Sequence, residues 1–171
     1  MLVSGVAAGI AAGVAFGGDW RRLGTFYLQW WPLLVVAAAL RLFTFFVPSA
    51  DVPTNVIGLV GIGVVAARNG RIPGAALIAI GTLANVLGMA VNQGMPYDAT
   101  ALASVGGKAP GDGLHILLSD ATRLPFLTDI IPFGLAHGVF SVGDFVIAFG
   151  GFLIPFMWLQ PEADAKRHDV R

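Results

Sequence analysis

Long apolar stretches, separated by short polar connections, make up most of the chain. Each stretch approaches the roughly 20 apolar residues that an α-helix needs to cross the hydrocarbon core of a bilayer. The second stretch contains one charge, Arg41, and the third stretch is the shortest. The pattern predicts an all-α membrane protein with a bundle of about five transmembrane helices, over residues 2–18, 26–47, 52–67, 73–95 and 139–159.

The segment between the last two stretches, residues 96–138, has a different pattern. It contains charges, glycines and prolines, and its apolar residues recur at helical spacing. This periodicity predicts one or two short amphipathic helices on the membrane surface. We therefore expect one transmembrane helical domain over residues 1–160, including this outer segment, and a polar tail over residues 161–171. The expected apolar face consists of Leu114, Leu117, Leu118, Ala121 and Leu124.

Basic residues follow alternate apolar stretches, which predicts the orientation of the bundle. Because positive charges favour cytoplasmic connections, we expect the N-terminus outside, the C-terminus in the cytoplasm and the outer segment outside. Lys108 and Arg123 lie in that outer segment and oppose this assignment. A cleaved signal peptide over residues 2–18 is an alternative, although this stretch lacks a basic start. The basic residues that set the orientation are Arg21, Arg22, Arg68, Arg71, Lys166, Arg167 and Arg171.

Composition agrees with a membrane protein and excludes several kinds of site. The chain is 56% hydrophobic and 12% charged, and its mean hydropathy is +0.78. The 10 basic and 10 acidic residues give no net charge, so we expect no nucleic-acid partner. The absence of cysteine excludes disulfides and thiolate metal sites. No histidine lies in an expected span, and we expect no cofactor and no metal.

Four glycines in the first stretch, Gly5, Gly9, Gly13 and Gly17, recur at every fourth residue. On a helix they form one smooth face that allows close approach of another backbone. This face either packs within the bundle, with Gly58 and Gly61 as its complement, or binds a partner membrane protein. Membrane lipids are the other expected partners.

Polar residues inside the expected spans fall in one layer of the outer leaflet. They are Arg41, Asn85, Asn92 and Asp144, with Asn55 at the start of the third span. Charged groups at membrane depth usually face the bundle interior and pair. We therefore expect a polar cluster with an Arg41–Asp144 ion pair that fixes the arrangement of the helices.

A second interpretation pairs Asp144 with Asp129, fifteen residues earlier in the apolar sequence FLTDIIPF. Two carboxylates that share one proton can act as general base and general acid on a peptide bond. In the structural interpretation, Asp129 instead points to solvent or caps a helix. His115 and His137 are expected at the surface.

Two resemblances bear on these residues. The sequence LTDIIPF followed by FSVGDFVIAFG resembles the C-terminal catalytic region of lipoprotein signal peptidases, which are intramembrane aspartic peptidases. That resemblance implies that Asp129 and Asp144 match the catalytic aspartates, although Ser141 stands where that family has Asn. Over its whole length, the chain is similar to an uncharacterised bacterial membrane family, through NVLGMAVNQGMPYD, a later histidine and FSVGD. This second resemblance implies the bacterial cell (inner) membrane and no established reaction.

Three functional classes therefore remain. The first is a structural or accessory membrane subunit with a polar cluster in the outer leaflet. The second is an aspartic peptidase of the lipoprotein type, and the third is a small carrier or lipid-binding membrane protein.

Overall fold

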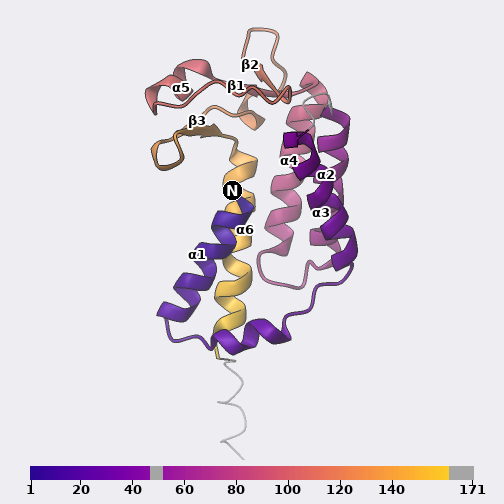
Figure 1. The fold of residues 1–171 in the computed structure, drawn as a ribbon, viewed down its shortest axis with the longest axis vertical. Coiled ribbons are helices and arrows are strands. Elements are labelled where there is room, and N and C mark those ends of the chain that lie inside the picture. Colours follow the sequence, from indigo (N-terminus) through magenta and orange to yellow (C-terminus); the bar gives the residue numbers. More distant parts are fainter. Residues whose placement is uncertain (47–51, 162–171) are drawn as a thin grey trace, which may run out of the picture.

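A computed structural model describes residues 1–46 and 52–161, and these are mostly helical (Figure 1). The polar tail expected over residues 161–171 lies almost entirely outside the described residues. Five helices form the body of the molecule: α1 (Leu2–Ala15), α2 (Trp31–Phe46), α3 (Val52–Arg68), α4 (Ala75–Asn92) and α6 (Val142–Leu159).

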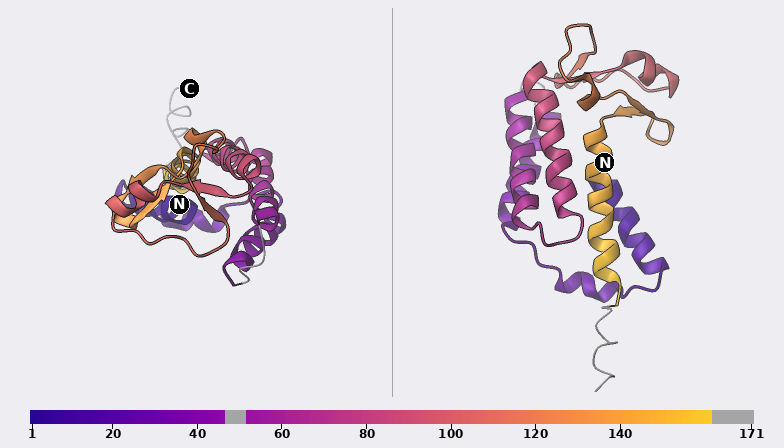
Figure 2. Two further views of the ribbon diagram at one scale, coloured as in Figure 1. Left: turned by 90° about the horizontal axis from the view of Figure 1, so that it is seen from above. Right: turned by 180° about the vertical axis from the view of Figure 1, so that it is seen from behind.

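The helices of the body pack in the order α1, α6, α4, α3, α2 (Figures 1 and 2). Helix α6 lies between α1 and α4, and α3 lies between α2 and α4. A short 3-10 helix, η1 (Trp20–Thr25), crosses the end of the bundle at which α1 and α6 finish.

Two helices, α4 and α6, are long and apolar enough to cross a membrane, whereas the apolar helices α1, α2 and α3 are shorter. Local backbone geometry accounts for one end of α1 and one end of α2. Gly17, just beyond the end of α1, has a φ of 85°, and Trp30, just before α2, has a φ of 63°. Both values lie in the left-handed region, which an α-helix does not contain.

Helix α1 packs on α6 through its glycines. A Cβ at Gly5 or Gly9 would collide with the backbone oxygen of Ala148 or Phe152, and one at Gly13 would lie 2.7 Å from Leu159. These contacts advance together along both helices, so α1 and α6 run in the same direction.

The remaining expected glycine contacts are wrong. Gly17 lies beyond the helix, and a Cβ placed there would meet no described residue within 4 Å. Gly58 and Gly61 face Ala37 of α2 and not α1. Small residues permit close approach at both places, but their spacing within one helix does not specify which helix packs there.

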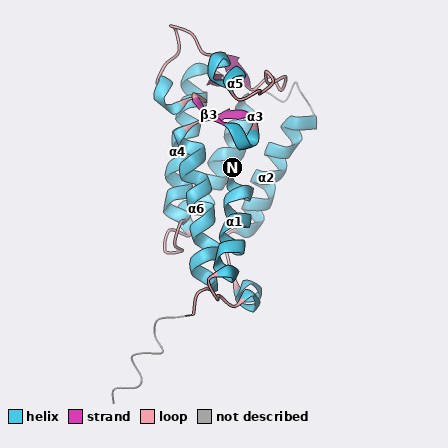
Figure 3. Cartoon of the chain, turned by 90° about the vertical axis from the view of Figure 1, so that its left-hand side faces the viewer, coloured by secondary structure: helices cyan, strands magenta, loops and turns pink. Residues whose placement is uncertain are grey.

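The outer segment forms a cap over the end of the bundle at which α6 begins (Figure 3). Strands β1 (Met95–Tyr97) and β2 (His115–Leu117) are parallel, and β3 (Ile131–Phe133) and β4 (Gly138–Phe140) are antiparallel. One short helix, α5 (Ala99–Ser104), follows β1. The 3-10 turns η2 (Pro125–Leu127) and η3 (Gly134–Ala136) complete the cap.

The amphipathic helix expected over Leu114–Leu124 is wrong. The Asp112 side chain accepts hydrogen bonds from the backbone N–H groups of Leu114 and His115, which forms a turn. Strand pairing then uses the backbone groups that a helix would need, because Met95 N donates to Leu114 O and Leu118 N donates to Tyr97 O. Helical spacing of leucines did not outweigh this long-range pairing.

Candidate functional site

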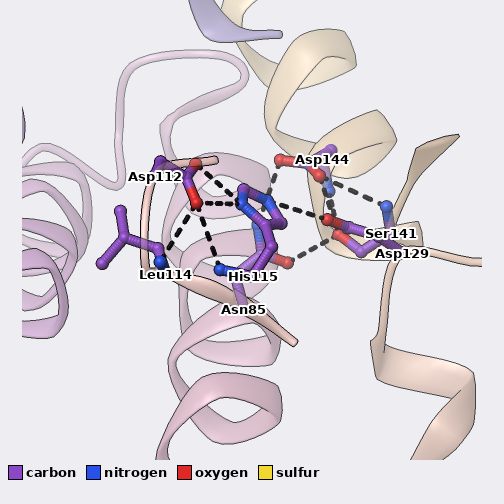
Figure 4. Close-up of polar contacts among 7 residues, drawn as sticks. All are labelled: Asn85, Asp112, Leu114, His115, Asp129, Ser141 and Asp144. Carbon is purple, nitrogen blue, oxygen red and sulfur yellow. Dashed lines mark hydrogen bonds and ion pairs between the residues drawn. The ribbon is translucent and has the colours of Figure 1, made fainter. Parts of the chain in front are cut away.

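A polar cavity of about 150 Å³ lies where the cap meets the helices. Its apolar wall comes from α3, α4, β1 and the turn before β2. Its polar wall consists of Arg41, Asn55, Asn85, Asp112, His115, Asp129 and Asp144. Five of these seven side chains are drawn in Figure 4. We refer to this space as the outer cavity.

Asp144 is the third residue of α6 and forms a capping box with Ser141. The Ser141 hydroxyl accepts a hydrogen bond from Asp144 N at 3.0 Å, and an Asp144 oxygen accepts one from Ser141 N at 3.2 Å. A carboxylate in the first turn also interacts favourably with the helix dipole. Asp144 therefore lies nearer the helix end than the expected span predicted, since α6 begins at Val142 and not at residue 139.

Asn85 of α4 connects the capping box to the neighbouring helix. Its amide nitrogen donates to Asp144 Oδ1 at 3.1 Å, and its carbonyl oxygen accepts from the Ser141 hydroxyl at 2.8 Å. Gly143 makes the approach possible, because a Cβ there would collide with the Asn85 side chain. These bonds hold both oxygens of Asp144 in a defined orientation (Figure 4).

Asp129 enters the cavity from the cap. Its backbone N donates to Pro96 O at 2.9 Å, and its backbone O accepts from Asp98 N at 3.0 Å, so its backbone is fixed to β1. The residue is only 5% exposed. The expectation that Asp129 points to solvent is therefore wrong, because strand-like pairing carries the residue under the cap.

His115 lies between two carboxylates. Its Nδ1 is 2.8 Å from Asp112 Oδ2, and its Nε2 is 3.5 Å from Asp129 Oδ2 (Figure 4). The His115 side chain is 28% exposed and also lines the outer cavity, whereas His137 is exposed and contacts Val105 O through Nδ1 at 2.7 Å. The spacing of Asp112 and His115 around a glycine-containing turn was the signal that could have indicated this contact.

These contacts shift the protonation of the cap residues. Burial alone would lower the pKa of His115, but the carboxylates of Asp129 and Asp112 outweigh it and raise the pKa to about 9. Partial burial would raise the pKa of Asp112, yet the contact with His115 lowers it. Burial raises the pKa of Asp129, and the charge of Asp144 adds to that effect, against the opposing effects of His115 and of the nearby Ser141 backbone N–H. At neutral pH, His115 is therefore a cation.

One oxygen of Asp129 has no hydrogen-bond partner. Oδ2 faces His115, whereas the buried Oδ1 accepts no hydrogen bond from any residue that the structure describes. Buried carboxylate oxygens are normally satisfied, because leaving one unpaired costs about 1 to 3 kcal/mol or more.

Arg41 and Asn92, the other two members of the expected polar cluster, have different positions. Arg41 of α2 lines the outer cavity and interacts electrostatically with Asp144. Asn92 is not part of this cluster, so its assignment there is wrong. Its side chain exchanges two hydrogen bonds with the backbone of Arg123, each 2.8 Å long, and thereby holds the cap to the end of α4.

The charged groups that line the outer cavity do not balance when its carboxylates are ionised. Within the described ranges, no group of three or more His, Asp or Glu side chains has an arrangement that could hold a metal. Three carboxylates and two cations line the cavity. When all three carboxylates are ionised, one negative charge is in excess there, next to the unpaired oxygen of Asp129.

Comparison with known proteins places the chain in a family. A model described as a family of unknown function (DUF5317) matches residues 25–156. The chain belongs to the DUF5317 family. The DUF5317 match includes every residue that lines the outer cavity and excludes α1. No curated protein and no solved structure matches the chain. The similarity to lipoprotein signal peptidases is not shown by these comparisons.

Proposed function

We propose that this protein is a multi-pass protein of the bacterial inner membrane that binds the ammonium group of a small ligand in its outer cavity. The third functional class from the sequence, a small carrier or lipid-binding protein, is the one that the cavity favours. The proposal depends on Asp129 Oδ1, which is buried and accepts no hydrogen bond from the described residues, in the cavity that Asp144 also lines.

Several features support the membrane assignment. Helices α4 and α6 have the length and hydropathy of a span. Exposed aromatic side chains gather in the segment that joins α1 to α2, among them Trp20, Tyr27 and Trp30. Arg68 lies over the Trp30 ring at 6.0 Å. Aromatic and basic residues together are typical of a membrane interface on the cytoplasmic side.

The direction of the helices supports an odd number of spans, and the basic residues then favour one of the two orientations. Five spans that alternate in direction would place the first and fifth parallel, and α1 and α6 do run in the same direction. The proposal therefore puts the N-terminus and the cap outside and the C-terminus in the cytoplasm. The outer cavity then opens toward the outer membrane surface.

The chemistry of the cavity supports an ammonium ligand. Such a group donates hydrogen bonds and has a positive charge, so it would satisfy Asp129 Oδ1 and balance the excess carboxylate. Binding would also favour the ionised form of Asp129, whose pKa burial raises. A cavity of this size is comparable to one that holds a benzene-sized molecule, so a group such as ethanolamine fits.

A structural or accessory role for the same cluster is the first alternative. A purely structural cluster would be expected to satisfy its own buried oxygens, as Asp144 does through Asn85 and Ser141.

A ligand-dependent change in thermal stability tests the proposal. Ethanolamine at neutral pH should raise the Tm of the detergent-solubilised protein above that in sodium chloride of equal ionic strength. A ligand present at 100 times its Kd stabilises the folded state by about 2.7 kcal/mol. Asp129→Asn should lose the effect. Asp98→Asn, which alters a cap on α5 outside the cavity, should keep it. Equal Tm values with ethanolamine and sodium, or an equal increase in Asp129→Asn, would leave the structural role as the better explanation.

An aspartic peptidase is the second candidate. Asp129 and Asp144 line one cavity, and the pKa of Asp129 is raised by burial and by the charge of Asp144. Against this role, Asp129 faces the cationic His115, and Asp144 is held by a capping box. Cleavage of a synthetic diacylated lipopeptide by the wild type, lost in both Asp129→Asn and Asp144→Asn, would favour the peptidase over the binding protein.

A further inference from the structure

A second cavity, of about 270 Å³, lies in the half of the bundle farther from the cap. We refer to it as the inner cavity. Helices α1, α3, α4 and α6 enclose it, together with Leu34 of α2 and part of the segment between α1 and α2. Its walls are apolar, and include Val6, Ile10, Ile62, Ile78 and Ile154.

The end of this cavity remote from the cap is closed by specific contacts. Trp158 Nε1 donates to Arg22 O at 2.9 Å, and the Arg22 guanidinium donates to Gln160 O. The Trp158 ring also meets Phe26 edge to face at 5.2 Å between centroids. These contacts fold the connection after α1 across the end of α6.

The two cavities lie one above the other between the same helices. On α3, Asn55 and Leu59 line the outer cavity, and Ile62, one turn further, lines the inner one. On α4, Asn85 lines the outer cavity, and Ile78 lines the inner one two turns away. A ligand that occupied both would therefore lie along the helices, with its polar end at the cap.

The walls restrict what the inner cavity can hold. Water is a poor occupant because it needs two to four polar partners, whereas apolar cavities bind apolar molecules. A helix of a partner protein, about 10 to 12 Å across with its side chains, needs more room than a cavity of about 270 Å³ offers. A flexible hydrocarbon chain meets both conditions.

We propose that the inner cavity binds the alkyl chain of an amphiphile whose ammonium head group lies in the outer cavity. This inference rests on the proposed function for its head group and adds the chemical class of the rest of the ligand. From Asp144 to Trp158, α6 rises about 21 Å at 1.5 Å per residue. The hydrocarbon core of a bilayer is about 30 Å thick, so the chain would extend past its middle.

Photolabelling of the full chain tests the inference directly. The probe is dodecylamine with a diazirine at the end of its chain, added to the detergent-solubilised protein, with adducts mapped by mass spectrometry. We expect adducts on Ile62, Ile78 or Ile154, in excess of those on the exposed side chains of Ile80 and Leu83.

Two neighbouring alanines provide a matched pair of variants. Ala66 is buried and lines the inner cavity, whereas Ala67 is exposed on the other side of α3. Ala66→Phe should fill the cavity and lower the adducts on its walls by about tenfold, as expected if roughly two methylenes lose their burial. Ala67→Phe should leave them unchanged. If Ala66→Phe does not fold, the distribution of adducts on the wild type decides the question alone.

The same probe with a hydroxyl head separates this inference from the proposed function. If both are right, Asp129→Asn weakens labelling by the amine and not by the alcohol. If only the inner cavity is right, both probes label its walls equally in the wild type and in Asp129→Asn. Adducts that follow surface exposure alone, with no difference between the two phenylalanine variants, would overturn the inference.

Discussion

Replacing Asn85 with alanine should destabilise the junction between α4 and α6. The substitution removes the donor to Asp144 Oδ1 at 3.1 Å and the acceptor of the Ser141 hydroxyl at 2.8 Å. The Ser141 hydroxyl can still donate to Asp144 Oδ2 at 3.0 Å, which partly compensates for the lost hydrogen bond to Asn85. The carboxylate loses a donor for one oxygen.

The magnitude follows from these contacts. Hydrogen bonds to charged groups contribute about 1.5 to 3 kcal/mol, whereas interhelical hydrogen bonds in membrane proteins average about 0.6 kcal/mol. Because Asp144 is only partly buried at the end of α6, we expect a loss of about 1 to 2 kcal/mol. For a chain of this size, that loss lowers Tm by roughly 2 to 8 °C.

A double-mutant cycle makes this prediction specific to the contact. Thermal unfolding in detergent would be compared for Asn85→Ala, Ser141→Ala and the double variant. Because the two side chains share a hydrogen bond, their effects should not add, with a coupling of about 0.5 to 1.5 kcal/mol. Strictly additive effects, or an unchanged Tm in Asn85→Ala, would refute the proposed junction.

Three further predictions concern other parts of the molecule. The pKa of His115 is about 9 in the folded state, above the ordinary value near 6.5. The contribution of His115 to stability should therefore be complete below about pH 6.5 and should be lost as the pH rises through the folded-state pKa of about 9. His115→Gln should remove this fall in Tm between neutral and alkaline pH. Gly9→Ala should lower stability by about 1 to 3 kcal/mol in chemical denaturation because its Cβ meets Phe152, whereas Gly24→Ala, with no neighbour within 4 Å, should not. In intact cells, a membrane-impermeant maleimide should label a single cysteine at Ser104 but not one at Gly70, and the reverse pattern would contradict the proposed orientation.

Local pattern was sufficient for the helices of the body. The apolar stretches predicted all five within a few residues, because hydropathy depends on neighbouring positions. The errors lie at the ends, where backbone geometry decides. Trp30 in the left-handed region delays α2, and the capping box at Ser141 sets the start of α6.

The outer cavity could be predicted only in part. Buried polar residues within the apolar stretches pointed to Arg41, Asn85 and Asp144, and all three line the cavity. His115 and Asp129 were missed as neighbours, since their approach requires β1 to pair with β2 on one side and with Asp129 on the other. No local periodicity encodes pairing between segments so far apart.

The sequence by itself determined the apolar helices, the small-residue face of α1 and the presence of polar groups near one end of the bundle. Each of these depends on residue type and spacing within one helix. Only the tertiary structure decided that α1 packs on α6, that the outer segment forms strands over the bundle, and that one buried oxygen of Asp129 accepts no hydrogen bond from the described residues. These features depend on contacts between distant segments, whose free energy outweighs the helical preference of any one of them.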